Sequence, residues 1–350
     1  MGVSATSFAA KWRSGPTQVI RVPESMAERL MAIARHWDTT GIEPLADHVL
    51  AEPSPVYQLG LPNIPRLEPG RPVNVSSVPQ LSPFRYPGGK TWLIPTIRAW
   101  LLHTKPKRLF EPFAGGAIVS LTAASENLVD EVVFCELDDG VAAVWKAILS
   151  DDCHWLIDRI LSFDLNEKTV REELSVSASD TKTRALQTIL RNRVQRGGIM
   201  APGAGFVKTG EGGRGLRSRW YPETLAKRLL AIYGQRERMH FIHGDALSKF
   251  RRYGNAQSSA LYVDPPYVKA ARRLYSCWNV DHQAIFERCR DLRGDVLMSY
   301  DHTSEVTNWA IQMNFDTRAI SMKHTHHTTM SELLIGKDMS WFDLSSKAAA

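Results

Sequence analysis

The chain has 350 residues, of which 43% are hydrophobic and 23% charged, a composition typical of soluble globular proteins with one large domain or two smaller ones. No apolar run approaches the ~18 residues that a membrane span needs, and residues 1–11 lack the apolar segment of a secretory signal. The four cysteines form no Cys-x-x-Cys pair, which argues against a zinc site or a disulfide framework. We therefore expect a cytoplasmic protein.

The formal net charge of +6 is unevenly distributed along the chain. Between Lys182 and Arg238, thirteen lysines and arginines stand against three acids, a local balance of +10, so the rest of the chain is net acidic. A basic segment inserted in an acidic body indicates a face that binds a polyanion.

The first 50 residues predict an accessory strand and helix. Gln18–Val22 alternates as a short strand, Pro23 can open a helix, and apolar residues then recur at helical spacing up to Trp37. The run VIRVPESMAERLMAIARHW loosely resembles the start of ribbon-helix-helix DNA-binding proteins, and a small helix that packs on the body or on a partner chain is the alternative. Seven prolines between Pro53 and Pro79 then predict a linker over 51–81.

From Ser82 onward, short apolar runs alternate with helical patterns. The expected strands are Leu109–Phe113, Val132–Cys135, Met239–His243, Leu261–Val263 and Val296–Ser299. The expected helices between them include Ala117–Ser125, Gly140–Ser150 and Asp281–Asp291. The closing runs, Thr317–Lys323 and Glu332–Gly336, predict a hairpin. Such alternation predicts a mostly parallel sheet with ligands at the carboxyl ends of its strands.

Three glycine-rich or acidic motifs lie where such a sheet binds ligands. In PFRYPGGK, Lys90 offers a cation for a carboxylate and Tyr86 an aromatic face, although a tight turn is the plain alternative. In LFEPFAGGAIVSL, a strand, a glycine turn and a helix point backbone amides at a ligand. In VVFCELDD, a strand ends in Glu136, which can accept both ribose hydroxyls of a nucleoside or be a solvated loop acid.

The most specific motif is ALYVDPPY, an apolar strand that ends in Asp264-Pro265-Pro266-Tyr267. The two prolines remove backbone donors and leave only acceptors around the carboxylate. An exocyclic amine fits such acceptors, because holding its two hydrogens makes the nitrogen more nucleophilic. The tyrosine ring can hold a base by stacking.

Together and in this order, the motifs resemble the Dam-type DNA adenine methyltransferases over about Ser82 to Phe342. The resemblance implies a class I, Rossmann-like α/β fold, with a mostly parallel seven-stranded sheet, a C-terminal antiparallel hairpin and a helical target-recognition insert. The insert at 151–238 would separate a cofactor-binding part, 82–150, from a catalytic part, 239–345. The implied reaction moves a methyl group from S-adenosylmethionine to the N6 amine of an adenine flipped out of duplex DNA.

The resemblance also assigns residues. The expected catalytic residues are Asp264, Pro265, Pro266 and Tyr267. The expected cofactor-binding residues are Tyr86, Gly88, Gly89, Lys90, Glu111, Pro112, Phe113, Gly115, Gly116, Glu136, Asp245 and Asp264. The expected partners are double-stranded DNA and, if the chain belongs to a restriction system, a cognate restriction enzyme. A bacterial or phage origin is also implied.

The chain departs from the family pattern in three places. The second glycine of the cofactor loop comes one place early, and the acid after the second strand is Glu136 where Asp is common. In the insert, Arg196-Gly197-Gly198 stands where better-known members place an aromatic-Asn-Gly that enters the DNA. The first two changes keep the chemistry, and the third concerns the target sequence.

The insert is the expected DNA-reading segment. It contains eight glycines between Gly197 and Gly215, interleaved with arginines and followed by an aromatic pair. A basic, glycine-rich loop beside aromatic rings suits phosphate and base contacts, although a solvated charged loop is the alternative. The expected DNA-binding residues are Arg85, Arg193, Arg196, Arg217, Arg219 and Trp220.

The sequence leaves two rival functions and raises the question of a metal site. DPPY also occurs among RNA methyltransferases, so an RNA base is the alternative substrate. A catalytically silent DNA-binding protein is the other rival, against which the intact Lys90, Glu136 and Asp264 argue. His324, His326 and His327 have the spacing of a polar turn, and methyl transfer from a sulfonium needs no metal, so none is expected.

Overall fold

The computed structural model describes residues 78–85, 89–200, 204–266, 279–323 and 329–342. The chain divides into two compact units, Met1–Asn63 and Ile64–Ala350, and the described residues belong to the second. The predicted N-terminal strand and helix, nearly all of the proline-rich linker, and the three histidines therefore lie outside the described residues.

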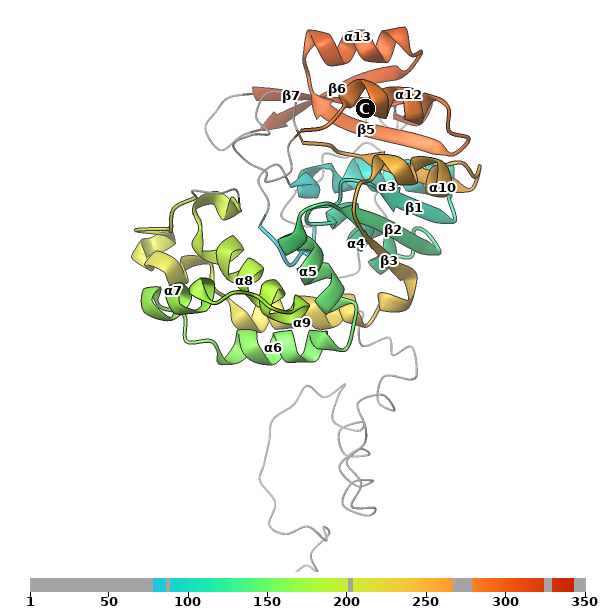
Figure 1. Cartoon of the computed structure of the whole chain (residues 1–350). Coiled ribbons are helices and arrows are strands. Elements are labelled where there is room, and N and C mark those ends of the chain that lie inside the picture. The colour runs from blue at the N-terminus through green and yellow to red at the C-terminus, as the bar shows by residue number, and fades with distance from the viewer. Residues whose placement is uncertain (1–77, 86–88, 201–203, 267–278, 324–328, 343–350) are drawn as a thin grey trace, which may run out of the picture. The chain divides into compact units, whose positions relative to one another are not determined.

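Seven strands form one sheet in the order β3-β2-β1-β4-β5-β7-β6 (Figure 1). The strands are β1 (Arg108–Glu111), β2 (Glu131–Glu136), β3 (Met239–His243), β4 (Ser259–Val263), β5 (Asp295–Asp301), β6 (Asp316–Lys323) and β7 (Thr329–Gly336). Strands β1 to β5 pair in parallel, and β7 runs antiparallel between β5 and β6. The predicted class I sheet, with its closing antiparallel hairpin, is confirmed.

Helices cover both faces of the sheet, because alternate strand residues point to opposite sides. One face packs on α3 (Ile94–Thr104), α4 (Ile118–Ser125) and α5 (Asp139–Ile148). The other packs on α10 (Phe250–Gly254), α12 (His282–Arg290) and α13 (Ser304–Gln312). In β4, Tyr262 belongs to the first core, whereas Leu261 and Val263 belong to the second.

The insert lies in the connection from α5 to β3 and is helical, as expected. Its helices are α6 (Asp152–Ser162), α7 (Glu167–Ser175), α8 (Thr181–Val194) and α9 (Pro222–Tyr233). The basic loop between α8 and α9 contains the short 3-10 helices η4 (Arg196–Gly198), η5 (Glu211–Gly213) and η6 (Gly215–Arg219). Buried residues of α8, such as Leu186 and Leu190, share one hydrophobic core with Trp145 of α5. The insert is therefore packed onto the sheet through α5.

The sheet brings the DPPY motif and the glycine turn to one edge. Strands β2 and β4 lie on opposite sides of β1, so the strand order reverses at β1. At such a reversal a crevice forms at the carboxyl ends of the adjacent strands, here β1 and β4. Pro112 follows the last residue of β1, and Asp264-Pro265-Pro266 follows β4. Because the two strands are parallel neighbours, Glu111 and Asp264 lie at the same edge.

Candidate active site

A cavity of about 990 Å³ opens at this edge, a volume at the upper end of the range for small-molecule sites. Of the predicted site residues, those that line it are Arg85, Gly89, Lys90, Glu111, Pro112, Phe113, Gly115, Gly116, Glu136, Arg193, Arg219, Asp245, Asp264 and Pro266. Pro265 is buried and does not line the cavity. Tyr86, Gly88 and Tyr267 lie outside the described residues.

Lys90 is a buried cation between two carboxylates. Its side chain is 3% exposed, and its Nζ lies 2.8 Å from Asp264 Oδ1 and 3.0 Å from Glu332 Oε1. Burial raises the pKa of both acids, and the ammonium opposes that rise. Lys90 thus forms ion pairs with two acids of the protein. The expected contact of Lys90 with a cofactor stays a prediction.

Asp264 keeps one oxygen for a ligand. Its Oδ1 accepts from Lys90 and from the Ser299 hydroxyl at 3.1 Å, and Ser299 in turn accepts from the Tyr262 hydroxyl at 2.8 Å. Within the described part of the chain, no hydrogen bond reaches Oδ2, and the Asp264 side chain is 20% exposed. The carboxylate is held in one orientation while its second oxygen can still accept an N–H.

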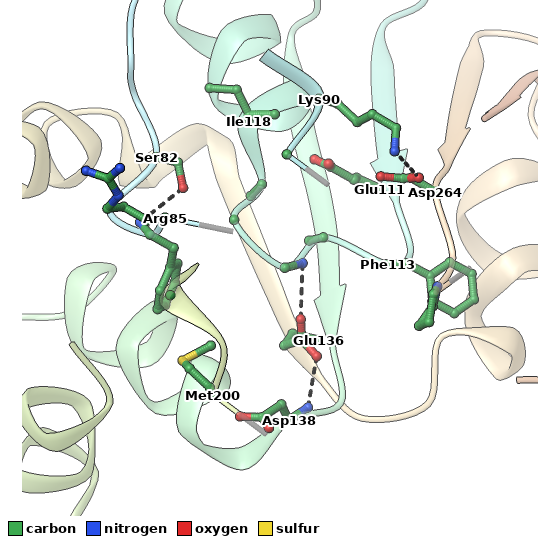
Figure 2. Close-up of a pocket in the computed structure, with 18 of the residues that line it drawn as sticks. Ser82, Arg85, Lys90, Glu111, Phe113, Ile118, Glu136, Asp138, Met200 and Asp264 are labelled. Atoms are coloured by element: carbon green, nitrogen blue, oxygen red, sulfur yellow. Dashed lines mark hydrogen bonds and ion pairs between the residues drawn. The ribbon is translucent and has the colours of Figure 1, made fainter. Parts of the chain in front are cut away.

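Glu111 lies beside Asp264, as Figure 2 shows. It is 3% exposed, and its Oε2 accepts the Ser120 amide at 2.8 Å. Burial raises the pKa of this carboxyl to about 8, so it is largely protonated at neutral pH in the absence of a cation. A positively charged ligand would favour its ionised form.

Glu136 joins the end of β2 to the glycine turn. Its Oε1 accepts the amides of Leu137 at 2.7 Å and Asp138 at 2.9 Å, and its Oε2 accepts the Gly115 amide at 3.1 Å (Figure 2). Burial raises its pKa to about 7. Because a carboxylate offers about four acceptor positions, the hydrogen bonds from the described residues leave one position on Oε2, and the expected ribose contact stays a prediction.

The glycine turn adopts backbone conformations that bring it close to its neighbours. Gly115 has φ +48° and Ala117 φ +49°, both left-handed, and α4 begins directly after them. A Cβ on Gly116 would lie 2.8 Å from Ser82 Oγ, so this position has no room for a side chain unless Ser82 moves. Trp145 donates from Nε1 to the Gly115 carbonyl at 3.0 Å and supports the turn from α5.

Acids and arginines occupy different parts of the cavity wall. The acids come from the strand ends and the loops after them, namely Glu111, Glu136, Asp138, Asp245, Asp264 and Asp281. The arginines come from residue 85 and the insert, namely Arg85, Arg193, Arg219 and Arg228. In Figure 2, Arg85 lies on the opposite side of the cavity from Lys90 and Asp264. The cavity is therefore suited to a cation at the strand ends and to an anion beside the insert.

Arg193 differs from the exposed contact that the sequence indicated. It is 6% exposed, and its Nη2 donates to the Pro83 carbonyl at 2.6 Å. Burial, then the nearby Arg228 and Arg85, lower its pKa to about 10. Among the described residues, no carboxylate pairs with Arg193 or Arg228. Arg193 thus faces the cavity from within the fold.

Three other predicted DNA contacts lie away from the cavity. Arg196 and Arg217 line a separate groove of about 800 Å³ on the insert, together with Arg171, Lys208 and Arg214. Arg217 donates to Asp164 Oδ1 at 3.0 Å and to the Leu165 carbonyl at 2.9 Å. Trp220 is partly buried against the ring of Phe163, with centroids 6.1 Å apart, and so anchors the loop to the insert.

Sequence reasoning missed four residues of the site. Glu332 was read as part of a closing strand, and Ser299 as part of a buried strand, although each contacts the Lys90–Asp264 pair. Arg228 and Asn192 were not singled out, because their contacts are to backbone atoms more than 100 residues earlier in the chain. A charged Glu332 directly before the apolar run Leu333–Ile335 was the one available signal.

A family model described as D12 class N6 adenine-specific DNA methyltransferase matches residues 86–327. The chain belongs to this family. The match includes the whole insert and every cavity-lining residue from Gly89 onward, so it confirms the resemblance drawn from the motifs. It does not decide which residues contact which ligand.

Two solved structures that resemble the chain have low sequence identity to it. The methyltransferase domain of bacterial CtHen1-CN has 10% identity and a TM-score of 0.33, covering 69% of this chain and 96% of that chain. Precorrin-6y C5,15-methyltransferase from Geobacter metallireducens has 10% identity and a TM-score of 0.29, covering 69% and 86%. A search of curated proteins finds no match. Across the described residues, no helix is long and apolar enough to cross a membrane, and no cluster of metal-ligating side chains occurs.

Proposed function

We propose that this family member transfers a methyl group from S-adenosylmethionine to the N6 amine of an adenine flipped out of duplex DNA. The observation that carries the proposal is the Oδ2 of Asp264, which accepts no hydrogen bond from the described residues and is fixed at the carboxyl end of β4 by Lys90 and Ser299. S-adenosylmethionine, when bound, supplies an electrophilic methyl group on a sulfonium. Its positive charge suits the acidic wall, where Asp264 and the buried Glu111 lie.

The chain's own residues would activate and hold the amine. Asp264 Oδ2 and a backbone carbonyl of Pro265-Pro266, of which Pro266 lines the cavity, would accept the two N6 hydrogens, which makes the nitrogen more tetrahedral and more nucleophilic. The new N–C bond forms as the S–C bond breaks, and the amine loses one proton, for which Asp264 is the adjacent acceptor. Tyr267 would stack on the base. Most of the rate would come from orientation and electrostatic preorganisation.

The remaining cofactor and DNA contacts are distributed over the cavity as its charges suggest. Glu136 would accept one ribose hydroxyl, and the amides of the glycine turn and Asp245 would hold the rest of the nucleoside. The arginine side of the cavity, with Arg85 and Arg219, suits the phosphates that accompany a flipped nucleotide. Arg196 and the groove around it face the flanking duplex in this proposal.

The test is transfer of a labelled methyl group to duplex DNA, single-stranded DNA and RNA, followed by digestion to nucleosides. We expect N6-methyladenine from duplex DNA, loss of it in Asp264→Asn, and full activity in Asp291→Asn, which changes an exposed acid outside the cavity. Label on RNA alone would favour the rival substrate. No label on any nucleic acid, with DNA binding intact, would favour a silent DNA-binding protein.

A further inference from the structure

Residues 82–85, here called the strap, are held by side chains of the insert. Asn192 of α8 is fully buried and pairs with Arg85 at both backbone groups: it accepts the Arg85 amide at 2.9 Å and donates to the Arg85 carbonyl at 2.9 Å. Its second N–H donates to the Gly198 carbonyl at 3.2 Å. Both donors of the Asn192 amide are therefore used within the protein.

The rest of the strap is bound in the same way. Arg193 donates to the Pro83 carbonyl at 2.6 Å, and Arg228 of α9 donates to the Ser82 carbonyl at 3.2 Å. Gly198 approaches so closely that a Cβ there would lie 2.3 Å from the Arg85 carbonyl oxygen, and its φ is +74°. The insert thus contacts three of the four residues of the strap through their backbone atoms.

The opposite side of the strap contacts the glycine turn of the cavity. Ser82 Oγ lies 2.8 Å from the position that a Cβ of Gly116 would occupy. The Phe84 ring packs edge-on against Trp145, with centroids 5.9 Å apart, and Trp145 donates to the Gly115 carbonyl. Ser82, Phe84 and Arg85 also line the cavity, and Figure 2 shows Ser82 and Arg85 at its wall.

We propose that Asn192 is a positioning residue for the cofactor site: it fixes the strap, and the strap fixes the Gly115–Gly116 turn. The insert that reads DNA then also completes the site for S-adenosylmethionine, a statement that rests on the proposed function. Because binding free energies are reciprocal, any effect of bound DNA on cofactor affinity implies an equal effect of the cofactor on DNA affinity. Asn192 itself touches neither ligand.

The test is the Kd for S-adenosylmethionine, measured by titration calorimetry on the full chain with and without duplex DNA. Asn192→Ala removes the pair with Arg85, and Asn192→Asp keeps its shape but cannot donate to the two carbonyls. We expect each to weaken cofactor binding about tenfold, or ~1.4 kcal/mol, and to reduce the difference between the two Kd values. Gly198→Ala disturbs the same contact from the other side and should act in the same direction.

Gln187→Ala is the matched control. Gln187 is also a buried amide of α8, 2% exposed, and it donates to the carbonyls of Glu173 at 2.8 Å and Val176 at 2.9 Å, both within the insert. Gln187→Ala should lower the melting temperature as the Asn192 variants do, yet leave the Kd for S-adenosylmethionine within about twofold of the value for the unmodified chain.

Equal weakening in Gln187→Ala, or an unchanged Kd in both Asn192 variants, would overturn this inference while leaving the proposed function intact. Failure of the unmodified chain to bind S-adenosylmethionine would overturn the proposed function and this inference together.

Discussion

Replacing Lys90 by Met tests the buried charge cluster at the strand ends. The substitution keeps the length of the side chain and removes the cation that faces Asp264 at 2.8 Å and Glu332 at 3.0 Å. The Coulomb attraction of each pair at this separation is ~5 kcal/mol at an effective dielectric constant of about 20, and the desolvation of the ions offsets much of it. Breaking buried ion pairs by removing one partner costs about 3–5 kcal/mol, and we expect a loss in this range at about pH 8.

The loss should depend on pH in a definite direction. Burial already raises the pKa values of Asp264 and Glu332, and removing Lys90 raises them further in the folded state. A carboxyl with a raised folded-state pKa lowers stability as pH rises from its unfolded-state pKa to its folded-state pKa, because the unfolded chain releases the proton first. At about pH 5.5 the variant can keep these acids neutral, and the loss should shrink to roughly a third of its value at pH 8.

The assay is urea unfolding of both proteins at the two pH values, with circular dichroism as the readout. A thermal scan should show the same trend, with the melting temperature of the variant lower by roughly 5–10 °C at about pH 8. An equal loss of unfolding free energy at both pH values would refute the reasoning. So would a variant that is more stable than the unmodified chain at pH 8.

Four further predictions concern two other acids and two arginines of the insert. Because the pKa of Glu136 is raised to about 7 and its ionised form accepts a hydroxyl, affinity for S-adenosylmethionine should rise from pH 6 to pH 8, and Glu136→Gln should flatten that slope in calorimetry. Glu332→Gln removes a buried carboxylate whose raised pKa lowers stability at high pH. The fall in melting temperature between pH 6 and pH 8.5 should therefore be smaller in this variant than in the unmodified chain. A steeper fall would contradict the prediction. Arg196→Ala should reduce the free energy of DNA binding by ~1–3 kcal/mol at the preferred site and relax sequence specificity there. Arg219→Ala should weaken binding to all DNA sequences alike. It should also lower the slope of log affinity against log salt concentration by about 0.9. Fluorescence anisotropy measures DNA binding for both arginine variants.

Strand and helix positions could be predicted from the sequence to within a few residues, because periodicity and breakers act locally. The strand expected at Leu109–Phe113 ends at Glu111 instead, since Pro112 cannot donate to the sheet ladder. The loop acids and glycines that line the cavity were found because parallel strands bring their carboxyl ends to one edge.

The side-chain contacts that determine the roles of the site residues could not be predicted from the sequence. Arg193 was expected to face DNA from a basic loop, whereas the last turn of α8 buries it against Pro83. The pairing of Lys90 with Glu332 spans most of the chain, and no local pattern connects the two residues. Asn192 lies in a helix of mixed polarity, where a buried amide resembles any other polar residue until its partner, Arg85, is known.

The most direct test of the account is the rate of N6-adenine methylation of duplex DNA by Asp264→Asn compared with the unmodified chain. Asparagine keeps the size of the side chain but can present an N–H where Oδ2 offers an acceptor, and it loses the charge that pairs with Lys90. We expect the rate to fall by about three orders of magnitude or more, the scale of losing a central electrostatic group, while S-adenosylmethionine and DNA still bind. A variant that retains more than about a tenth of the rate would contradict the assignment of Asp264 as the residue that activates the amine.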